Sequence, residues 1–120
     1  MPRVVVAHAT AAGRLALRMV VENEPQLELV SDAATAGDAG RLARERHADF
    51  LVLSDGLLAT GRTGVLPASC AVVLLGMAVR PDRATAALIP GAHGYVRWDR
   101  AAEDLPPVLL AEAPPTVSAK

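Results

Sequence analysis

Five short apolar runs, separated by longer segments of mixed polarity, constrain the fold of this chain more than any other feature. Residues 4–7 (VVVA), 50–53 (FLVL) and 72–75 (VVLL) are continuous apolar runs, whereas 27–30 (LELV) alternates and 93–96 (HGYV) is weaker. A continuous run of about four apolar residues is typical of a strand buried on both faces of a parallel sheet. The segments between the runs are mostly long enough for a helix, so the pattern predicts repeated βα units.

The segments between the runs predict helices of unequal quality. Residues 11–22 and 35–46 carry apolar side chains at helical spacing, and a helix is also expected at 81–89. Residues 55–69 contain three glycines and one proline, so we expect one or two helical turns there at most. Pro106-Pro107 is expected to divide the last segment into a turn at 100–105 and a short helix from about 106.

Five βα units with short connections predict an α/β domain with a doubly wound parallel sheet of strand order 2-1-3-4-5 and right-handed crossovers. The third helix would be stunted and the fifth short. In such a sheet, functional side chains gather beyond the carboxyl ends of the strands. The residues expected at that edge are His8, Ala9, Ser54, Gly76 and Trp98.

Composition excludes several classes of protein. The chain has 120 residues and a net charge of −1, so no global basic field attracts it to nucleic acid. A single cysteine rules out an internal disulfide, and neither a secretory leader nor an apolar run long enough to span a membrane is present. We therefore expect a cytoplasmic domain without membrane contact. One lysine, Lys120, against eleven arginines is typical of high-GC coding, as in actinobacteria.

Three stretches resemble the receiver domain of bacterial response regulators, and more narrowly that of LuxR-type transcription factors. They are residues 2–7 (PRVVVA), 42–53 (LARERHADFLVL) and 91–95 (GAHGY), the last of which is similar to the family's approach to its fifth strand. The resemblance covers residues 2–113 in order and at nearly the family's spacing. It implies the flavodoxin-like receiver fold.

The same resemblance implies a phosphorylation site, and this chain departs from it at every position. In the family, an acidic pair after the first strand holds Mg²⁺, and an aspartate after the third strand accepts a phosphoryl group. A Thr or Ser after the fourth strand and a lysine after the fifth bind the phosphoryl oxygens. The corresponding residues here are His8 and Ala9, Ser54, Gly76 and Trp98.

These replacements remove the chemistry that the family uses. Mg²⁺ prefers carboxylate and other hard oxygen ligands, and a serine hydroxyl is a weak nucleophile without a base or metal beside it. We therefore expect no Mg²⁺, no other cofactor and no enzymatic activity. Asp55 could still accept a phosphoryl group, but only if the third strand slipped by one residue. A hydrolytic dyad of His8 and Ser54 would lack a third group to orient the imidazole.

The resemblance implies a regulatory role for the domain. Residues 1–113 would be the receiver-like domain, and 114–120 would begin a linker to a helix-turn-helix domain that binds DNA and lies outside this chain. An atypical regulator of this kind would act without phosphorylation, by forming a homodimer or by sensing a small molecule. Some atypical members of the family from actinobacteria respond to products of antibiotic biosynthesis, which makes a pathway product one expected ligand.

Particular residues are candidates for these two roles. A ligand would be bound by His8, Ser54, Asp55 and Trp98, unless Trp98 itself fills the vacated site. The expected dimer face comprises Tyr95, Arg97 and Leu88. Two other functions stay open: a stand-alone receiver-like module that docks a partner protein, and a conventional phospho-acceptor that uses Asp55.

Overall fold

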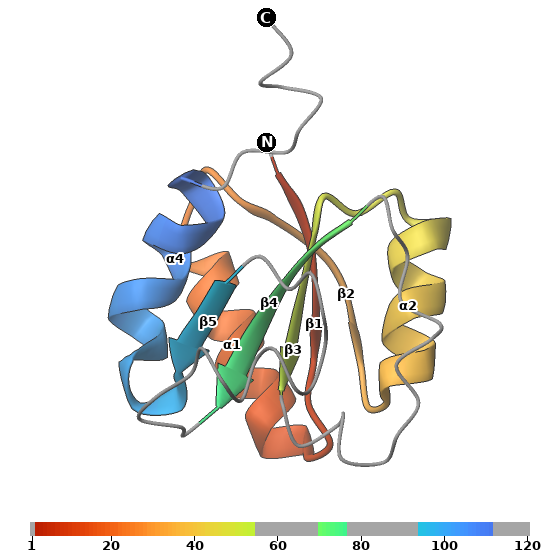
Figure 1. The fold of residues 1–120 in the computed structure, drawn as a ribbon, viewed down its shortest axis with the longest axis horizontal. Coiled ribbons are helices and arrows are strands. Elements are labelled where there is room, and N and C mark those ends of the chain that lie inside the picture. The colour runs from red at the N-terminus through yellow and green to blue at the C-terminus, as the bar shows by residue number, and fades with distance from the viewer. Residues whose placement is uncertain (1, 55–69, 77–93, 112–120) are drawn as a thin grey trace, which may run out of the picture.

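The computed structural model describes residues 2–54, 70–76 and 94–111. Its five strands are all parallel and lie in the order β2-β1-β3-β4-β5, which confirms the predicted sheet (Figure 1). The strands are β1 (Arg3–Ala7), β2 (Glu28–Ala33), β3 (Phe50–Ser54), β4 (Ala71–Gly76) and β5 (Gly94–Arg97).

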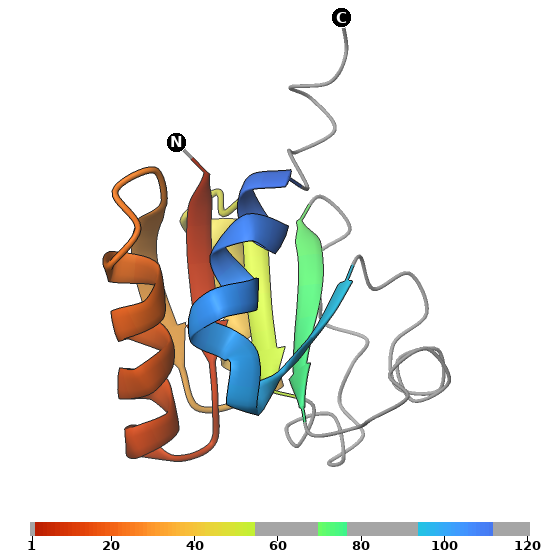
Figure 2. The ribbon, with the colours of Figure 1, turned by 90° about the vertical axis from the view of Figure 1, so that its left-hand side faces the viewer.

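Helices cover both faces of this sheet. Helices α1 (Ala11–Glu22) and α4 (Ala101–Ala111) lie side by side on one face, and α2 (Ala36–Glu45) lies on the other (Figures 1 and 2). A single 3-10 turn, η2 (Trp98–Arg100), joins β5 to α4. The predicted helical segments at 55–69 and 81–89, including the stunted third helix, lie outside the described residues. No helix in the described part of the chain is long and apolar enough to cross a membrane.

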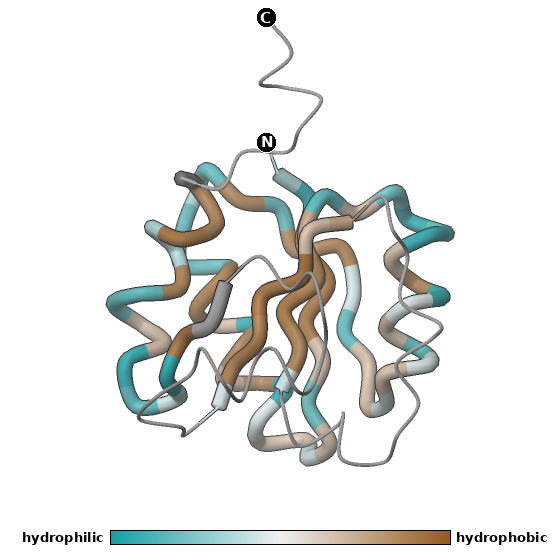
Figure 3. Tube along the Cα trace, viewed as in Figure 1, coloured by the Kyte–Doolittle hydropathy of each residue, from teal (hydrophilic) through white to brown (hydrophobic). Residues whose placement is uncertain are grey.

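The strands form two cores because alternate residues point to opposite faces of the sheet. On β1, Val5 faces α2 and Val4 faces α1 and α4. β3 alternates in the same way, with Leu51 on the α2 side and Phe50 on the other. All of these side chains are fully buried, and the central strands are apolar over most of their length (Figure 3). The continuous apolar runs in the sequence therefore correspond to strands covered on both sides.

The prediction of a short last helix broken by two prolines is wrong. Pro106 and Pro107 lie inside α4, which is continuous over 11 residues. A proline inside a helix costs about 3 kcal/mol, because it lacks an N–H donor and crowds the preceding turn. Burying a leucine contributes about 1.5–3 kcal/mol, and α4 buries both Leu105 and Leu109 completely. Burial of these two leucines thus offsets much of the cost of the two prolines, and the helix continues through both of them.

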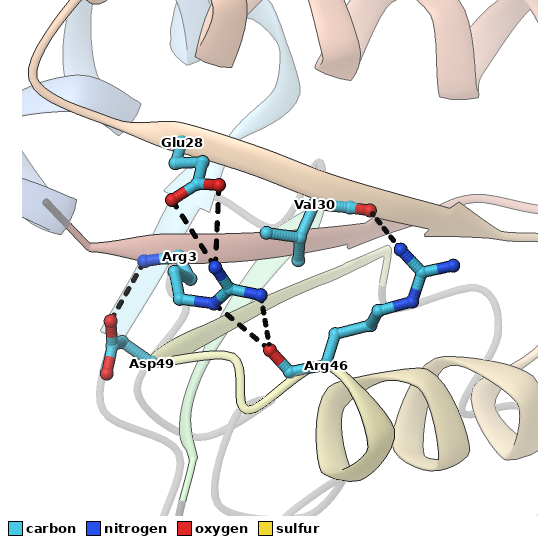
Figure 4. Close-up of polar contacts among 5 residues, drawn as sticks. All are labelled: Arg3, Glu28, Val30, Arg46 and Asp49. Carbon is cyan, nitrogen blue, oxygen red and sulfur yellow. Dashed lines mark hydrogen bonds and ion pairs between the residues drawn. The ribbon is translucent and has the colours of Figure 1, made fainter.

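The end of α2 is held by a residue from β1. The Arg3 guanidinium donates from Nε and from one terminal nitrogen to the carbonyl oxygen of Arg46, at 3.0 and 2.7 Å (Figure 4). Its other terminal nitrogen lies 3.4 Å from a Glu28 carboxylate oxygen, and its backbone N–H donates to Asp49 at 2.9 Å. Orphan carbonyls at a helix end need such partners. This network lies at the amino end of the sheet, opposite the candidate site.

Candidate functional site

The predicted edge positions do come together at the carboxyl end of the sheet. In the β1–β3 register the last residue of β1 pairs with Leu53, so that His8 and Ser54 follow at the same level on adjacent strands. Gly76 ends β4 and pairs with the last residue of β5, which Trp98 follows directly. The β3 pairings run without a shift to Ser54, as the sequence register requires.

His8 is held in one orientation by its neighbours. Its backbone N–H donates to the carbonyl oxygen of Ala33 at 3.1 Å. Its imidazole Nδ1 accepts the backbone N–H of Thr10 at 3.1 Å and lies 3.2 Å from the Thr10 hydroxyl oxygen. The same hydroxyl accepts the N–H of Gly13 at 3.0 Å and so caps α1. The lone pair of Nδ1 is therefore committed to the start of α1.

The imidazole of His8 is close to both a glycine and an aromatic ring. A Cβ atom added at Gly13 would collide with the imidazole, so the ring packs directly against the helix backbone. The imidazole also contacts Trp98, with the ring centroids 5.3 Å apart and the planes tilted by 48°. That geometry is within the range of favourable aromatic pairs. Trp98 therefore turns back toward β1 and covers His8.

The environment of His8 favours its neutral form. Burial lowers the pKa of His8, and the nearby positive charge of Arg14 lowers it further. The Arg14 guanidinium donates to the carbonyl oxygens of His8 and Ala9 at 3.0 and 3.3 Å. A cation therefore stands close to the position where a receiver would hold Mg²⁺.

These residues do not fit a magnesium ion. The Ala9 side chain has no ligand atom and its carbonyl oxygen already accepts from Arg14, His8 offers a nitrogen that already accepts a hydrogen bond, and Arg14 adds positive charge. In the described part of the chain, no group of three or more His, Cys, Asp or Glu residues could hold a metal ion.

The described residues also lack an activated nucleophile. Ser54 is buried at the end of β3. Burial raises the pKa of the Cys70 thiol to about 12, with a smaller contribution from Asp49, so the reactive thiolate is scarce at neutral pH.

The other residues predicted to bind a ligand or to form the dimer face are only partly described. Asp55 and Leu88 lie outside the described residues, Tyr95 is placed in β5 by its backbone, and Arg97 forms an ion pair with Asp99 at 2.9 Å.

Sequence reasoning missed three residues that shape this site: Thr10, Gly13 and Arg14. A glycine two residues after the start of a predicted helix was the available signal, because glycine is a poor helix former. The sequence did not show which side chain needed the space.

Comparison with known proteins supports the fold and leaves the function open. No protein-family model matches the chain, and no curated protein matches it. Among solved structures, it is similar to the response regulator RcsB from Salmonella typhimurium, with TM-score 0.71 and 17% identity over 88% of this chain and 58% of that one. It therefore spans little more than half of the RcsB chain.

Two further structures are similar over most of both chains. A LuxR-family DNA-binding response regulator from Staphylococcus aureus has TM-score 0.71 and 19% identity over 92% of this chain and 98% of that one. The receiver domain of the putative response regulator NarL from Mycobacterium tuberculosis has TM-score 0.62 and 22% identity over 80% and 82%. The chain thus has the receiver fold.

Proposed function

We propose that this chain is the regulatory receiver domain of a LuxR-type response regulator that is not switched by phosphorylation. The observation that carries the proposal is the contact between His8 and Trp98. These two residues stand where the resemblance expects a magnesium-binding carboxylate and a phosphate-binding lysine. Here they pack on each other instead.

The electrostatics of the site support this proposal. A transferring phosphoryl group develops negative charge that a divalent cation and a lysine normally offset. Trp98 carries no charge, and His8 is kept neutral by burial and by Arg14. Arg14, a cation near His8, is already hydrogen bonded to two backbone carbonyls. A phosphoryl group here would lack both its metal and its usual lysine.

Without phosphorylation, the domain would act by forming a homodimer or by binding a small molecule, and any contact with DNA would be made by a separate domain. RcsB, whose structure bound to a promoter is known, and the Staphylococcus aureus regulator are DNA-binding proteins with receiver domains of this fold. We expect no enzymatic activity from the present chain.

Incubation with acetyl phosphate and Mg²⁺, followed by intact mass measurement, tests the proposal. We expect no gain of a phosphoryl group and no Mg²⁺-dependent change of Trp98 fluorescence with beryllofluoride. The receiver domain of RcsB serves as the positive control. A mass gain that Asp55→Asn abolishes would overturn the proposal and favour the conventional phospho-acceptor.

A small-molecule site is the second candidate, favoured by the half-buried Trp98 ring that lies over His8. A flat apolar ligand could displace or extend this aromatic pair. Because Trp98 is the single tryptophan of the chain, its fluorescence reports on that site alone. A saturable change upon titration with aromatic metabolites, lost in His8→Ala, would support ligand sensing. Absence of any change would favour the protein-interaction role.

A further inference from the structure

Helix α1 presents an apolar stripe to solvent. Leu15 and Met19 are large hydrophobic residues that are 56% and 55% exposed, and Ala12 and Ala16 beside them are exposed as well. These four residues follow the i, i+3, i+4, i+7 spacing of one helix face. The buried side chains of the same helix, Leu17 and Val21, point to the opposite side. We call the four exposed residues the α1 stripe.

The flank of the α1 stripe carries charges that already form ion pairs with one another. Arg18 lies 3.8 Å from Glu22 and 3.6 Å from Asp32. Exposed apolar side chains of this kind often mark protein–protein contacts when they are contiguous and rimmed by polar groups. The stripe therefore has an apolar centre without charge and a polar edge.

We propose that the α1 stripe binds the α1 stripe of a second copy of this chain, with the two helices antiparallel. This inference specifies the dimer in the proposed function and places it on a different surface from Tyr95, Arg97 and Leu88. The order of side-chain sizes favours a second copy. With the twofold axis between residues 15 and 16, Met19 of each copy lies over the small Ala12 of the other.

The same arrangement brings Leu15 of the two copies together at the axis. It also places the two Ala16 side chains on the opposite flank, where their small size lets the helices approach. Met19 thus packs against the small Ala12, and Leu15 packs against its own copy at the twofold axis. Close packing between helices requires this kind of fit between large and small side chains.

Charge complementarity supports the antiparallel direction. α1 has no acidic residue in its first turn and no basic residue in its last turn, so neither end of its dipole is compensated within the helix. In an antiparallel pair, each helix end lies beside the opposite end of its partner. Glu22 of one copy then lies near the first turn of the other, where a negative charge is favourable.

The size of the stripe limits the strength of this dimer. Stable interfaces bury about 800 Å² on each partner, and one helix face with four apolar residues offers less. We therefore expect weak, concentration-dependent self-association, which a linked domain that dimerises would strengthen.

Engineered cysteines test both the surface and the direction. The native Cys70 is buried and its thiol is protonated, so it does not compete for oxidation. Leu15→Cys should form a disulfide-linked dimer rapidly under mild oxidation. Met19→Cys alone should not, because Met19 faces Ala12, but the double variant Ala12→Cys/Met19→Cys should. Ala102→Cys, on an exposed position of α4, measures random collisions.

Cross-linking of Met19→Cys as fast as Leu15→Cys would overturn the antiparallel arrangement, because in a parallel pair every stripe residue faces its own copy. Rates no faster than that of Ala102→Cys would overturn the interface itself. Sedimentation over a concentration series adds a second measure, in which Leu15→Glu should weaken self-association at least about tenfold and Ala102→Glu should not. Phosphorylation by acetyl phosphate would disprove the proposed function but leave this result unchanged.

Discussion

Gly13 lies in the first turn of α1, where a glycine costs a helix about 0.5–1 kcal/mol relative to alanine. The structure gives a reason for that cost, since the imidazole of His8 occupies the space of the missing side chain. At the scale of single residues, the site is therefore closed by mutual fit among Gly13, His8 and Trp98. A substitution at any one of these three residues should therefore change the packing of the other two.

Gly13→Ala should destabilise the domain by about 1–3 kcal/mol, despite the better helix propensity of alanine, because the new methyl group displaces the imidazole. The matched control is Gly37→Ala in α2, where nothing lies within 4 Å of the added atom and a gain of about 0.5–1 kcal/mol is expected. Urea denaturation measures both. In a His8→Ala background the Gly13→Ala penalty should vanish, and a penalty that persists would show that His8 is not its cause.

His8 should make the domain sensitive to mild acid. Because the pKa of His8 is lowered by burial and by Arg14, the unfolded chain binds a proton from about pH 6.5 downward while the folded chain resists it. Stability is therefore complete above that pH and declines as the pH falls from about 6.5 toward the lowered folded pKa. Protonation would also remove the lone pair that accepts the Thr10 N–H.

Denaturation series at pH 7.5 and at pH 5.5 measure this effect, with Trp98 fluorescence as the signal. His8→Gln should lose less stability between the two pH values than the parent, because it removes the imidazole whose pKa is lowered in the folded state. Equal losses in the parent and His8→Gln would contradict the assignment to His8.

At the scale of elements, the strands could be predicted well and the last helix could not. Runs such as residues 50–53 and 72–75 are apolar on both faces, and a parallel sheet covered by helices typically buries both faces of its strands. Local signals were misleading where tertiary burial opposed them, as for Pro106 and Pro107 in α4. The candidate site was likewise predictable only in part. The positions of its residues follow from the ends of the strands. The contact between His8 and Trp98 depends on side-chain packing, which the spacing of residues in the sequence does not show.

Pro107→Ala should stabilise the domain by about 1–3 kcal/mol, because it restores a backbone hydrogen bond within α4 and relieves crowding against the preceding turn. Pro107 is exposed, so its ring contributes little to the core. Thermal unfolding measures the change, with Ala102→Ser on the same helix as a control for substitution at an exposed site. A decrease in stability would show that rigidity of the unfolded chain outweighs the strain in the helix.

The end of α2 makes a second prediction for an element. His47 follows the helix with φ of 53°, a left-handed conformation that disfavours residues with a Cβ atom. The backbone N–H of Ala48 then bonds to the carbonyl oxygen of Ala43 at 2.9 Å and closes the helix end. His47→Gly should therefore raise the free energy of unfolding by about 0.5–1 kcal/mol. His47→Ala is the control, because it removes the imidazole but keeps the Cβ atom. If alanine raised the free energy of unfolding as much as glycine does, relief of backbone strain would be excluded as the cause.

At the scale of the whole molecule, Cys70 reports on opening of the fold. The thiol is buried in the core on the α2 side of the sheet, and its pKa is raised to about 12 by burial and by Asp49. Both effects suppress the thiolate, so a thiol reagent should react with Cys70 only when the structure opens. For a domain with an unfolding free energy of at least about 5 kcal/mol, labelling in buffer should be slower than in 6–8 M urea by a factor of about a thousand or more.

The effect of two distant substitutions on this labelling rate then distinguishes global unfolding from local opening. If Cys70 becomes accessible only by global unfolding, Gly37→Ala should slow labelling and Gly13→Ala should accelerate it, by the factors that correspond to their changes in stability. This holds although neither glycine is in contact with the thiol, since stability is a property of the whole cooperative unit. If neither substitution changes the rate of Cys70 labelling, the start of β4 opens on its own, independently of the rest of the sheet.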